Sequence, residues 1–281
     1  MNTALKTRPP SKKDAAAAAA KKAAIDAAKQ ACLLKAIIAY DIEGHYIGTK
    51  PPLGDEAYLS TKAVVDAHRV EETVDKAAIV ATAPPTKYLC THHDLLLLAG
   101  TAYGEASTLD CYEEMAGIAS VLWRQMSARS CATMSELRSK HPSYAYGWST
   151  KNPRFKNFES AHPEKVDKRE KNDGMRLAIK GAINAITGGT DYSNGAYFWD
   201  GVDLGTNYDH HPKMQAGYKF TSDAHRIYNV DGAPITDNAV AHPGKSPYDY
   251  TYETTAAWGK TVFSKFTSEY QTGAHHPAKY V

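Results

Sequence analysis

The stretch 95-LLLLAGTAYGEASTLDCYEEMAGIASVLWR-124 decides the fold, and Glu105 stands near its centre. Leu95, Leu98 and Ala102 are spaced three and four residues apart, so they share one face of a helix, and Glu105 continues that face. Burial on an apolar face disfavours the charged form of a carboxyl group and raises its pKa. A carboxylic acid that stays protonated near neutral pH suits a general acid in glycosidic bond cleavage. The spacing also fits an exposed Glu at a fraying helix end, so both interpretations stay open.

The segments around this stretch read mainly as helices. Thr91 and Asp94 resemble a capping box before the apolar run, and Gly188-Gly189 is typical of a helix C-terminus. The expected helices cover 14–40, 60–78, the run ending at Glu105, 112–128 and 173–187. Glu113 and Glu114 fall in the first turn of the 112–128 helix, where the helix dipole favours negative charge.

Short strands complete the predicted fold, which is α+β and mainly α. Strand-like composition appears at Ala196–Trp199, with further short strands expected at 218–220 and 226–230, and a strand or helix at 258–270. The break at Pro84-Pro85 marks the expected boundary between a helical N-terminal region, 1–85, and a catalytic body, 86–281. The Ala-rich helix at 14–40 would belong to the first region.

Composition limits the functional classes. A net charge of +2 over 281 residues gives no broad electrostatic case for nucleic acid. No apolar run is long enough for a membrane helix, and the first residues lack the pattern of a cleaved signal peptide. Cys90, Cys111 and Cys131 flank the central stretch, either as disulfide partners or as free thiols.

No metal or cofactor is predicted. The His92-His93 doublet does not place two ligands on one helix face, and no H-E-x-x-H motif is present. The aspartates between 191 and 209 would suit calcium, but their spacing fits no EF-hand loop, and Asp is common in turns.

Aromatic side chains concentrate in two segments that would frame a groove. The segment 135–158, expected to form a short helical turn and then an irregular loop, carries Tyr146 and Trp148, and the strand expected at 196–199 carries Tyr197 and Trp199. Such side chains offer an apolar face with a polar tip for stacking on sugar rings. Core packing is the alternative for each of them.

Three pieces of the chain, in order, resemble the cell-wall hydrolase family that includes the bacterial spore cortex-lytic enzymes. The first is Tyr103-Gly104-Glu105-Ala106 at the end of an apolar helix. The second is GIASVLWR at 117–124, and the third is MRLAIKGAINAITGGTDYSNGAYFWDG at 175–201. The resemblance covers roughly 94–201. It departs at Trp123, where the family usually has Asn, and in the longer, more polar segment 140–173.

The resemblance implies a lysozyme-like catalytic body that cleaves the β-1,4 bond of the peptidoglycan glycan strand, as a muramidase or a lytic transglycosylase. Glu105 takes the position of the family's catalytic Glu. Hydrolysis would need a second carboxylate, for which Asp200, Asp110 and Glu114 are candidates and Asp200 is favoured. Attack by the sugar's own hydroxyl would need Glu105 alone. The expected substrate contacts are Tyr103, Tyr146, Trp148, Tyr197 and Trp199.

The resemblance also implies a place of action and partners. An enzyme of this class without a cleaved signal would be made in the bacterial cytoplasm and act in the periplasm or cell wall, as a phage lysis enzyme or a secreted antibacterial effector. We favour the effector interpretation, with an immunity protein and a secretion-machine component bound through 1–85 as candidate partners. The alternatives are a non-catalytic wall-binding or secretion-apparatus protein on a degenerate hydrolase fold, and a peptidase or amidase acting on the peptide stems.

Overall fold

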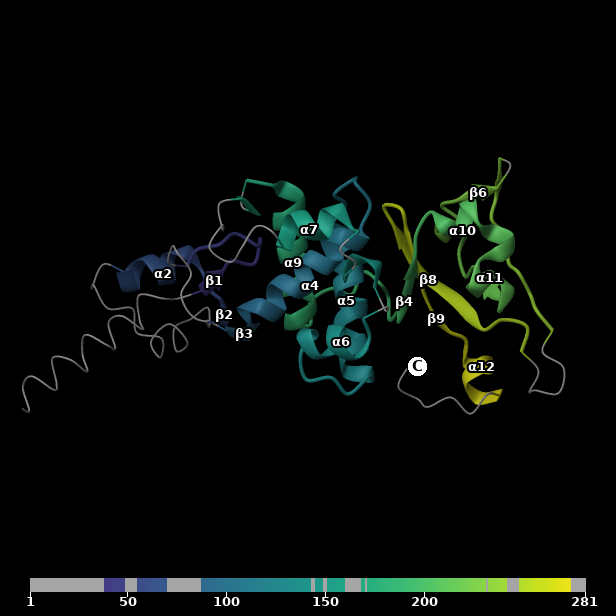
Figure 1. Ribbon diagram of the computed structural model, residues 1–281, viewed down its shortest axis with the longest axis horizontal. Coiled ribbons are helices and arrows are strands. Elements are labelled where there is room, and N and C mark those ends of the chain that lie inside the picture. The colour runs from purple at the N-terminus through teal and green to yellow at the C-terminus, as the bar shows by residue number, and fades with distance from the viewer. Residues whose placement is uncertain are drawn as a thin grey trace, which may run out of the picture.

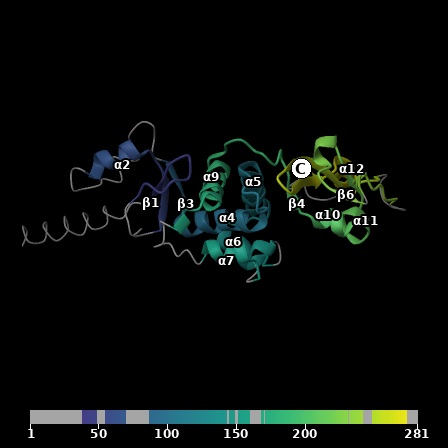
Figure 2. The same cartoon turned by 90° about the horizontal axis from the view of Figure 1, so that it is seen from above.

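The fold is α+β, and helices predominate in the part of the chain that can be described. The computed structural model describes residues 38–48, 55–69, 87–142, 145–148, 151–159, 168–169, 171–230, 232–241 and 248–273. Three helices form the centre, with one small sheet at either end (Figures 1 and 2). Within these residues, no helix is long and apolar enough to cross a membrane.

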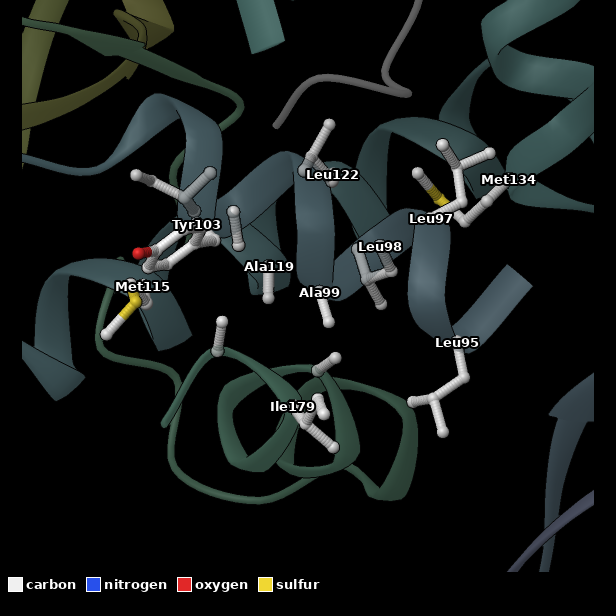
Figure 3. Packing of buried hydrophobic residues seen from close by; sticks show 14 of the residues in the cluster. Leu95, Leu97, Leu98, Ala99, Tyr103, Met115, Ala119, Leu122, Met134 and Ile179 are labelled. Carbon is white, nitrogen blue, oxygen red and sulfur yellow. The ribbon is translucent and has the colours of Figure 1, made fainter. Parts of the chain in front are cut away.

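The central helices are α4 (His92–Glu105), α5 (Tyr112–Ala128) and α9 (Asp173–Thr187), and they pack against one another around the main hydrophobic core (Figure 3). Leu95, Leu98 and Ala102 are fully buried there, as the spacing predicted. Small residues allow close contact between α5 and α9. A Cβ added to Gly181 would lie 3.0 Å from Cα of Ala116.

The predicted helix ends are confirmed at α4 and α9. The Thr91 hydroxyl accepts a hydrogen bond from the Asp94 backbone N–H at 3.1 Å and donates one to the Asp94 carboxylate at 3.0 Å. At the other boundary, Gly188 adopts a left-handed conformation with φ of 71°, which glycine accepts without steric cost.

The segment after α5 is more helical than predicted. It contains α6 (Met134–Lys140), the 3₁₀ turn η1 (Tyr146–Trp148) and α7 (Pro153–Glu159). The short helical turn expected at the start of 135–158 is confirmed by α6, but the irregular loop expected after it is wrong for 153–158. Burial of Phe155 and Phe158 against the core explains why this stretch forms a helix.

The C-terminal sheet has the order β4-β9-β8-β5. Its strands are β4 (Phe198–Asp200), β5 (Tyr218–Lys219), β8 (Tyr252–Trp258) and β9 (Thr261–Phe266). Around it lie α10 (Asp203–Thr206), α11 (Pro212–Gln215), α12 (Ser268–Gly273), the turns η2 (Tyr208–His210) and η3 (Asp223–His225), and the pair β6 (Asn229–Val230) and β7 (Ala233–Pro234). A second core cluster, which includes Leu204, Met214 and Val262, lies between the sheet and these helices.

The N-terminal sheet corrects one prediction. Strands β1 (Ile38–Tyr40), β2 (Glu56–Leu59) and β3 (Lys87–Thr91) pair in that order, and α2 (Lys62–Arg69) follows β2. The helix expected at 14–40 is therefore wrong for residues 38–40, and the rest of that prediction lies outside the described residues. The buried side chains of Ile38 and Tyr40 favour the strand. The boundary predicted near 85 stays a prediction, and β3 pairs with β2 across it.

Candidate functional site

A cavity of about 690 Å³ opens where the end of α4 meets β4, α10 and the β8–β9 turn. Four carboxylates line it, namely Glu105, Glu114, Asp200 and Asp203. Three aromatic side chains and two lysines also contribute, namely Tyr146, Phe198, Trp199, Lys213 and Lys260. The lining therefore combines apolar ring faces with charge, which is the usual composition of a site for a polar ligand.

Glu105 is the last residue of α4, and its carboxyl group is held by two donors from elsewhere in the chain. The Gly147 backbone N–H donates to Oε1, and the Trp199 indole N–H donates to Oε2 at 3.1 Å. Burial raises the pKa of Glu105, and the nearby Asp203 charge raises it further, although the two hydrogen bonds act in the opposite direction. The interpretation of Glu105 as a fraying, exposed end is therefore wrong, because the side chain is oriented and desolvated.

The approach of η1 to Glu105 depends on a glycine. A Cβ on Gly147 would lie 3.0 Å from Oε1 and 3.3 Å from Cγ of Glu105. Nothing in the sequence around Gly147 indicates this contact, because it joins residues far apart along the chain.

Asp200, the favoured second carboxylate, lines the cavity but is buried in an ion pair. Its Oδ2 lies 2.7 Å from Nζ of Lys213, and the aspartate side chain is only 8% exposed. The imidazole of His211 lies 3.6 Å from its other oxygen. The charge of Asp200 is therefore balanced by Lys213, and its side chain has little access to solvent water.

Glu114, another predicted candidate, is fully buried and hydrogen-bonded on both oxygens. It accepts from the backbone N–H and hydroxyl of Ser107, the backbone N–H of Lys260, and the hydroxyl of Thr261, over 2.6–3.1 Å. These bonds tie the first turn of α5 to the loop after α4 and to the β8–β9 turn. Glu114 therefore has a structural role. The favourable position in the helix dipole explains only part of why a glutamate stands there.

Asp110, the third candidate, is ruled out by its position. Its carboxylate lies 2.7 Å from Nη2 of Arg154, and it does not line the cavity.

Asp203 is a further carboxylate on the cavity wall that the sequence did not single out. It is the first residue of α10 and lines the cavity, with a side chain that is 61% exposed. The Gly201 backbone N–H donates to Oδ1 at 3.1 Å, and Nε2 of His211 lies 3.4 Å from Oδ2. Interaction with His211 lowers the pKa of Asp203. The sequence signal for it is the run of aspartates between 191 and 209, to which Asp203 belongs.

The predicted aromatic contacts divide into two groups. Tyr146, which is 59% exposed, and Trp199 line the cavity beside Glu105. Trp148 and Tyr103 are buried instead. The Trp148 indole donates to the Thr101 hydroxyl at 2.8 Å, so the core-packing interpretation holds for it.

Tyr103 and Tyr197, also predicted as substrate contacts, each lie against an arginine. Cζ of Arg154 lies 3.8 Å from the ring centroid of Tyr103, and Cζ of Arg124 lies 5.4 Å from that of Tyr197. Neither tyrosine lines the cavity. Tyr103 is buried, which is against substrate contact, whereas the half-buried Tyr197 stays a prediction.

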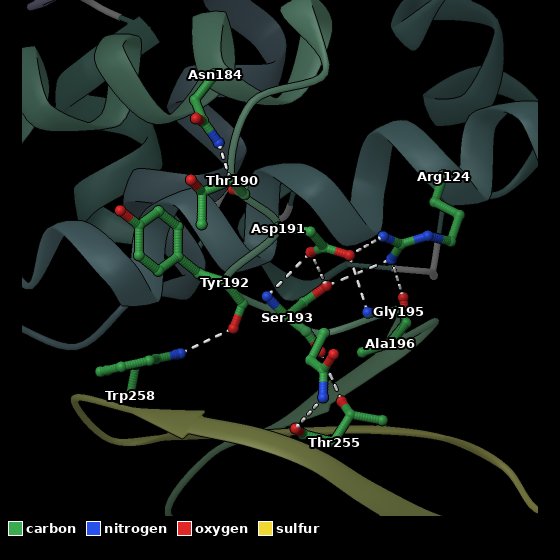
Figure 4. A network of polar contacts seen from close by, with 11 residues as sticks. Arg124, Asn184, Thr190, Asp191, Tyr192, Ser193, Gly195, Ala196, Thr255 and Trp258 are labelled. Atoms are coloured by element: carbon green, nitrogen blue, oxygen red, sulfur yellow. Dashed lines mark hydrogen bonds and ion pairs between the residues drawn. The ribbon is translucent and has the colours of Figure 1, made fainter.

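Arg124, the last residue of the motif quoted at the outset, fixes the loop that leads into β4 (Figure 4). It forms an ion pair with Asp191 and donates to the Ala196 carbonyl and the Ser193 hydroxyl. Burial alone would raise the pKa of Asp191, but hydrogen bonds from Ser193 and Gly195, together with Arg124, hold it below its usual value. This network sets the path of the chain toward Trp199.

The histidines, carboxylates and cysteines of the described segments form neither a metal-binding group nor a disulfide. Within the described segments, no three His, Cys, Asp or Glu side chains are grouped to hold a metal ion. Cys90, Cys111 and Cys131 are free thiols, so the disulfide alternative is excluded among these three.

Comparisons of the chain with protein-family models, with curated proteins and with solved structures gave no match. The geometry of the cavity therefore carries the functional argument.

Proposed function

We propose that the protein cleaves the β-1,4 glycosidic bond of the peptidoglycan glycan strand, with Glu105 as the general acid. The observation that carries this proposal is a half-buried, oriented carboxyl group with a raised pKa on the wall of a cavity lined by aromatic rings. The motif resemblance to cell-wall hydrolases supplies the substrate class. The lysozyme-like fold of the body is part of the same proposal.

The chemistry assigns one role to each contact of Glu105. The protonated carboxyl group donates its proton to the bridging oxygen as the C1–O bond breaks, and the bonding electron pair stays on that oxygen. The Gly147 and Trp199 donors keep the carboxyl group in one orientation, which reduces the entropic cost of reaching the transition state. Tyr146 and the face of Trp199 are the ring surfaces on which a sugar would stack.

The competing proposal is a non-catalytic wall-binding or secretion-apparatus protein with the same cavity. Glu105→Gln separates the two, because it preserves the shape of the side chain and removes the proton donor. Loss of general acid catalysis reduces activity by about 10²–10⁴-fold, whereas binding to purified sacculi should be retained. Glu113→Gln is the matched control, since Glu113 also lies in this region but does not line the cavity.

The assay is the release of soluble fragments from purified sacculi, with melting temperatures to verify folding. Equal activity of wild type and Glu105→Gln would eliminate the enzymatic proposal as stated. Sequencing the fragments by mass spectrometry also tests the amidase or peptidase alternative, which would leave the glycan strand intact.

Delivery as an antibacterial effector stays a proposal that rests on the resemblance. It predicts that residues 1–85 are needed for delivery but not for wall cleavage in vitro. Normal delivery after deletion of that region would count against a loading role. An immunity partner, if there is one, is expected to block the cavity beside Glu105.

A further inference from the structure

We propose that Asp203 is the second catalytic carboxylate and that the enzyme is a hydrolase, with Asp203 activating the attacking water. This inference rests on the proposed function of Glu105. It deepens that proposal by choosing between hydrolysis and intramolecular transglycosylation, which the sequence left open. It also assigns the role of second carboxylate to Asp203 in place of Asp200, which the sequence favoured.

Elimination of the other carboxylates on the cavity wall is the first step. Asp200 is paired with Lys213 at 2.7 Å and is almost inaccessible. Glu114 is fully buried and accepts four hydrogen bonds from protein donors. A general base must reach a water molecule in the cavity with a free lone pair, and neither group meets that requirement.

Asp203 does meet it. Its side chain is 61% exposed on the cavity wall, and the basic side chain paired with it is a histidine rather than a lysine or arginine. The Gly201 N–H and His211 each contact one oxygen, so each oxygen keeps a lone-pair direction for water. A carboxylate that is fixed in position but open to solvent is suited to activating a water molecule.

His211 holds Asp203 from the protein side. The imidazole is 5% exposed, and its Nε2 faces both Asp203 at 3.4 Å and Asp200 at 3.6 Å. Its Nδ1 is buried and finds no hydrogen-bond partner among the described residues. A proton on Nε2 has carboxylate acceptors within reach, whereas a proton on Nδ1 would be a buried donor without an acceptor.

The two carboxyl groups are driven toward opposite protonation states. Burial raises the pKa of Glu105, and His211 lowers the pKa of Asp203. The negative charge of Asp203 also contributes to the raised pKa of Glu105, and both side chains line the same cavity. Carboxyl groups whose environments separate their pKa values in this way are the usual acid and base of a glycosidase.

The reaction balances as a hydrolysis. Glu105 gives its proton to the bridging oxygen, and the C1–O bond breaks with its electron pair on the leaving sugar. Water forms the new bond to C1, and Asp203 accepts the proton that this water loses. Exchange with solvent then returns a proton to Glu105 and removes one from Asp203.

The experiment compares wild type with Asp203→Ala, Asp203→Asn and the matched control Asp209→Ala on purified sacculi. Asp209 lies in η2 and does not line the cavity. Wild type should release fragments with reducing ends. Both Asp203 variants should lose about 100-fold or more of this activity, whereas Asp209→Ala should stay close to wild type.

Azide provides a readout that a structural role would not move. Azide attacks C1 without needing a base, so it should restore bond cleavage by Asp203→Ala and yield a glycosyl azide in place of the reducing end. Anhydro ends from wild type, or Asp203 variants as active as Asp209→Ala, would overturn the inference.

The wild-type product decides between hydrolysis and transglycosylation even if both Asp203 variants fail to fold, because the formation of anhydro ends uses no water. The two proposals also fail separately. Full activity in Glu105→Gln would remove the proposed function, whereas an inactive Glu105→Gln with anhydro wild-type products would remove only the role of Asp203.

Discussion

Glu105 illustrates what a single residue's sequence context can and cannot reveal. Its place on an apolar helix face follows from residue spacing, and burial of that face is confirmed. Its two hydrogen-bond donors lie 42 and 94 residues further along the chain, so only the folded structure brings them to the carboxyl group. Asp200 is a second example, because its ion pair with Lys213 joins β4 to α11, and the sequence did not indicate that contact.

Trp199→Phe tests the hydrogen bond to Glu105 while keeping an aromatic ring in the cavity. The indole N–H stabilises the carboxylate and lowers the pKa of Glu105, so its loss raises that pKa further. The acid then stays protonated to higher pH, and the alkaline limb of kcat/KM should move to higher pH. An alkaline limb that is unchanged or moves to lower pH would contradict this role.

Gly147→Ala tests the close contact between η1 and Glu105. The added Cβ would lie 3.0 Å from Oε1, so either the carboxyl group or η1 must shift. A small displacement of a catalytic group reduces kcat by about 10–100-fold. We expect this loss with little change in melting temperature, and wild-type kcat in the variant would show that the contact is not needed.

At the scale of elements, the long helices were predictable and the sheet was not. Helices 112–128 and 173–187 match their predicted bounds because their apolar periodicity is sustained over several turns. Strands β8 and β9 lack clean alternation, because β8 has consecutive buried residues at Thr254, Thr255 and Ala256. Their pairing around the turn at Gly259, where φ is 58°, was not predicted.

Glu114→Gln tests the link between α5 and the β8–β9 turn. The glutamate accepts four hydrogen bonds, and a glutamine amide would place a donor against donors in a fully buried site. A buried polar group left unsatisfied costs about 1–3 kcal/mol. Urea unfolding should show a loss of this size for Glu114→Gln and almost none for Glu113→Gln; equal stabilities of the two variants would contradict the structural role.

At the scale of the whole molecule, the sequence predicted the α+β class and the burial of the helix face that carries Glu105. It did not predict that the cavity wall would include α10 and the β8–β9 turn, since Asp203 and Lys260 approach Glu105 only through the order of the C-terminal sheet. It also placed a helix where β1 lies, because residue composition at 32–40 fits a buried helix and a buried strand equally.

The raised pKa of Glu105 predicts a pH dependence of folding stability. Because the folded chain binds this proton more tightly than the unfolded chain, stability falls as pH rises from about 4.5 through the folded pKa. Glu105→Gln has no such proton, so it should be more stable than wild type above that range, and the difference should shrink below pH 4.5. Thermal unfolding of both proteins across pH measures this, and a constant difference would contradict a desolvated acid.

The most direct test of the central claim is mass spectrometry of the fragments that wild type and Glu105→Gln release from purified sacculi. The account predicts new glycan-chain ends from wild type and from the Glu113→Gln control, and none above background from Glu105→Gln. Glycan ends produced equally by Glu105→Gln, or wild-type fragments cut only in the peptide stems, would contradict it.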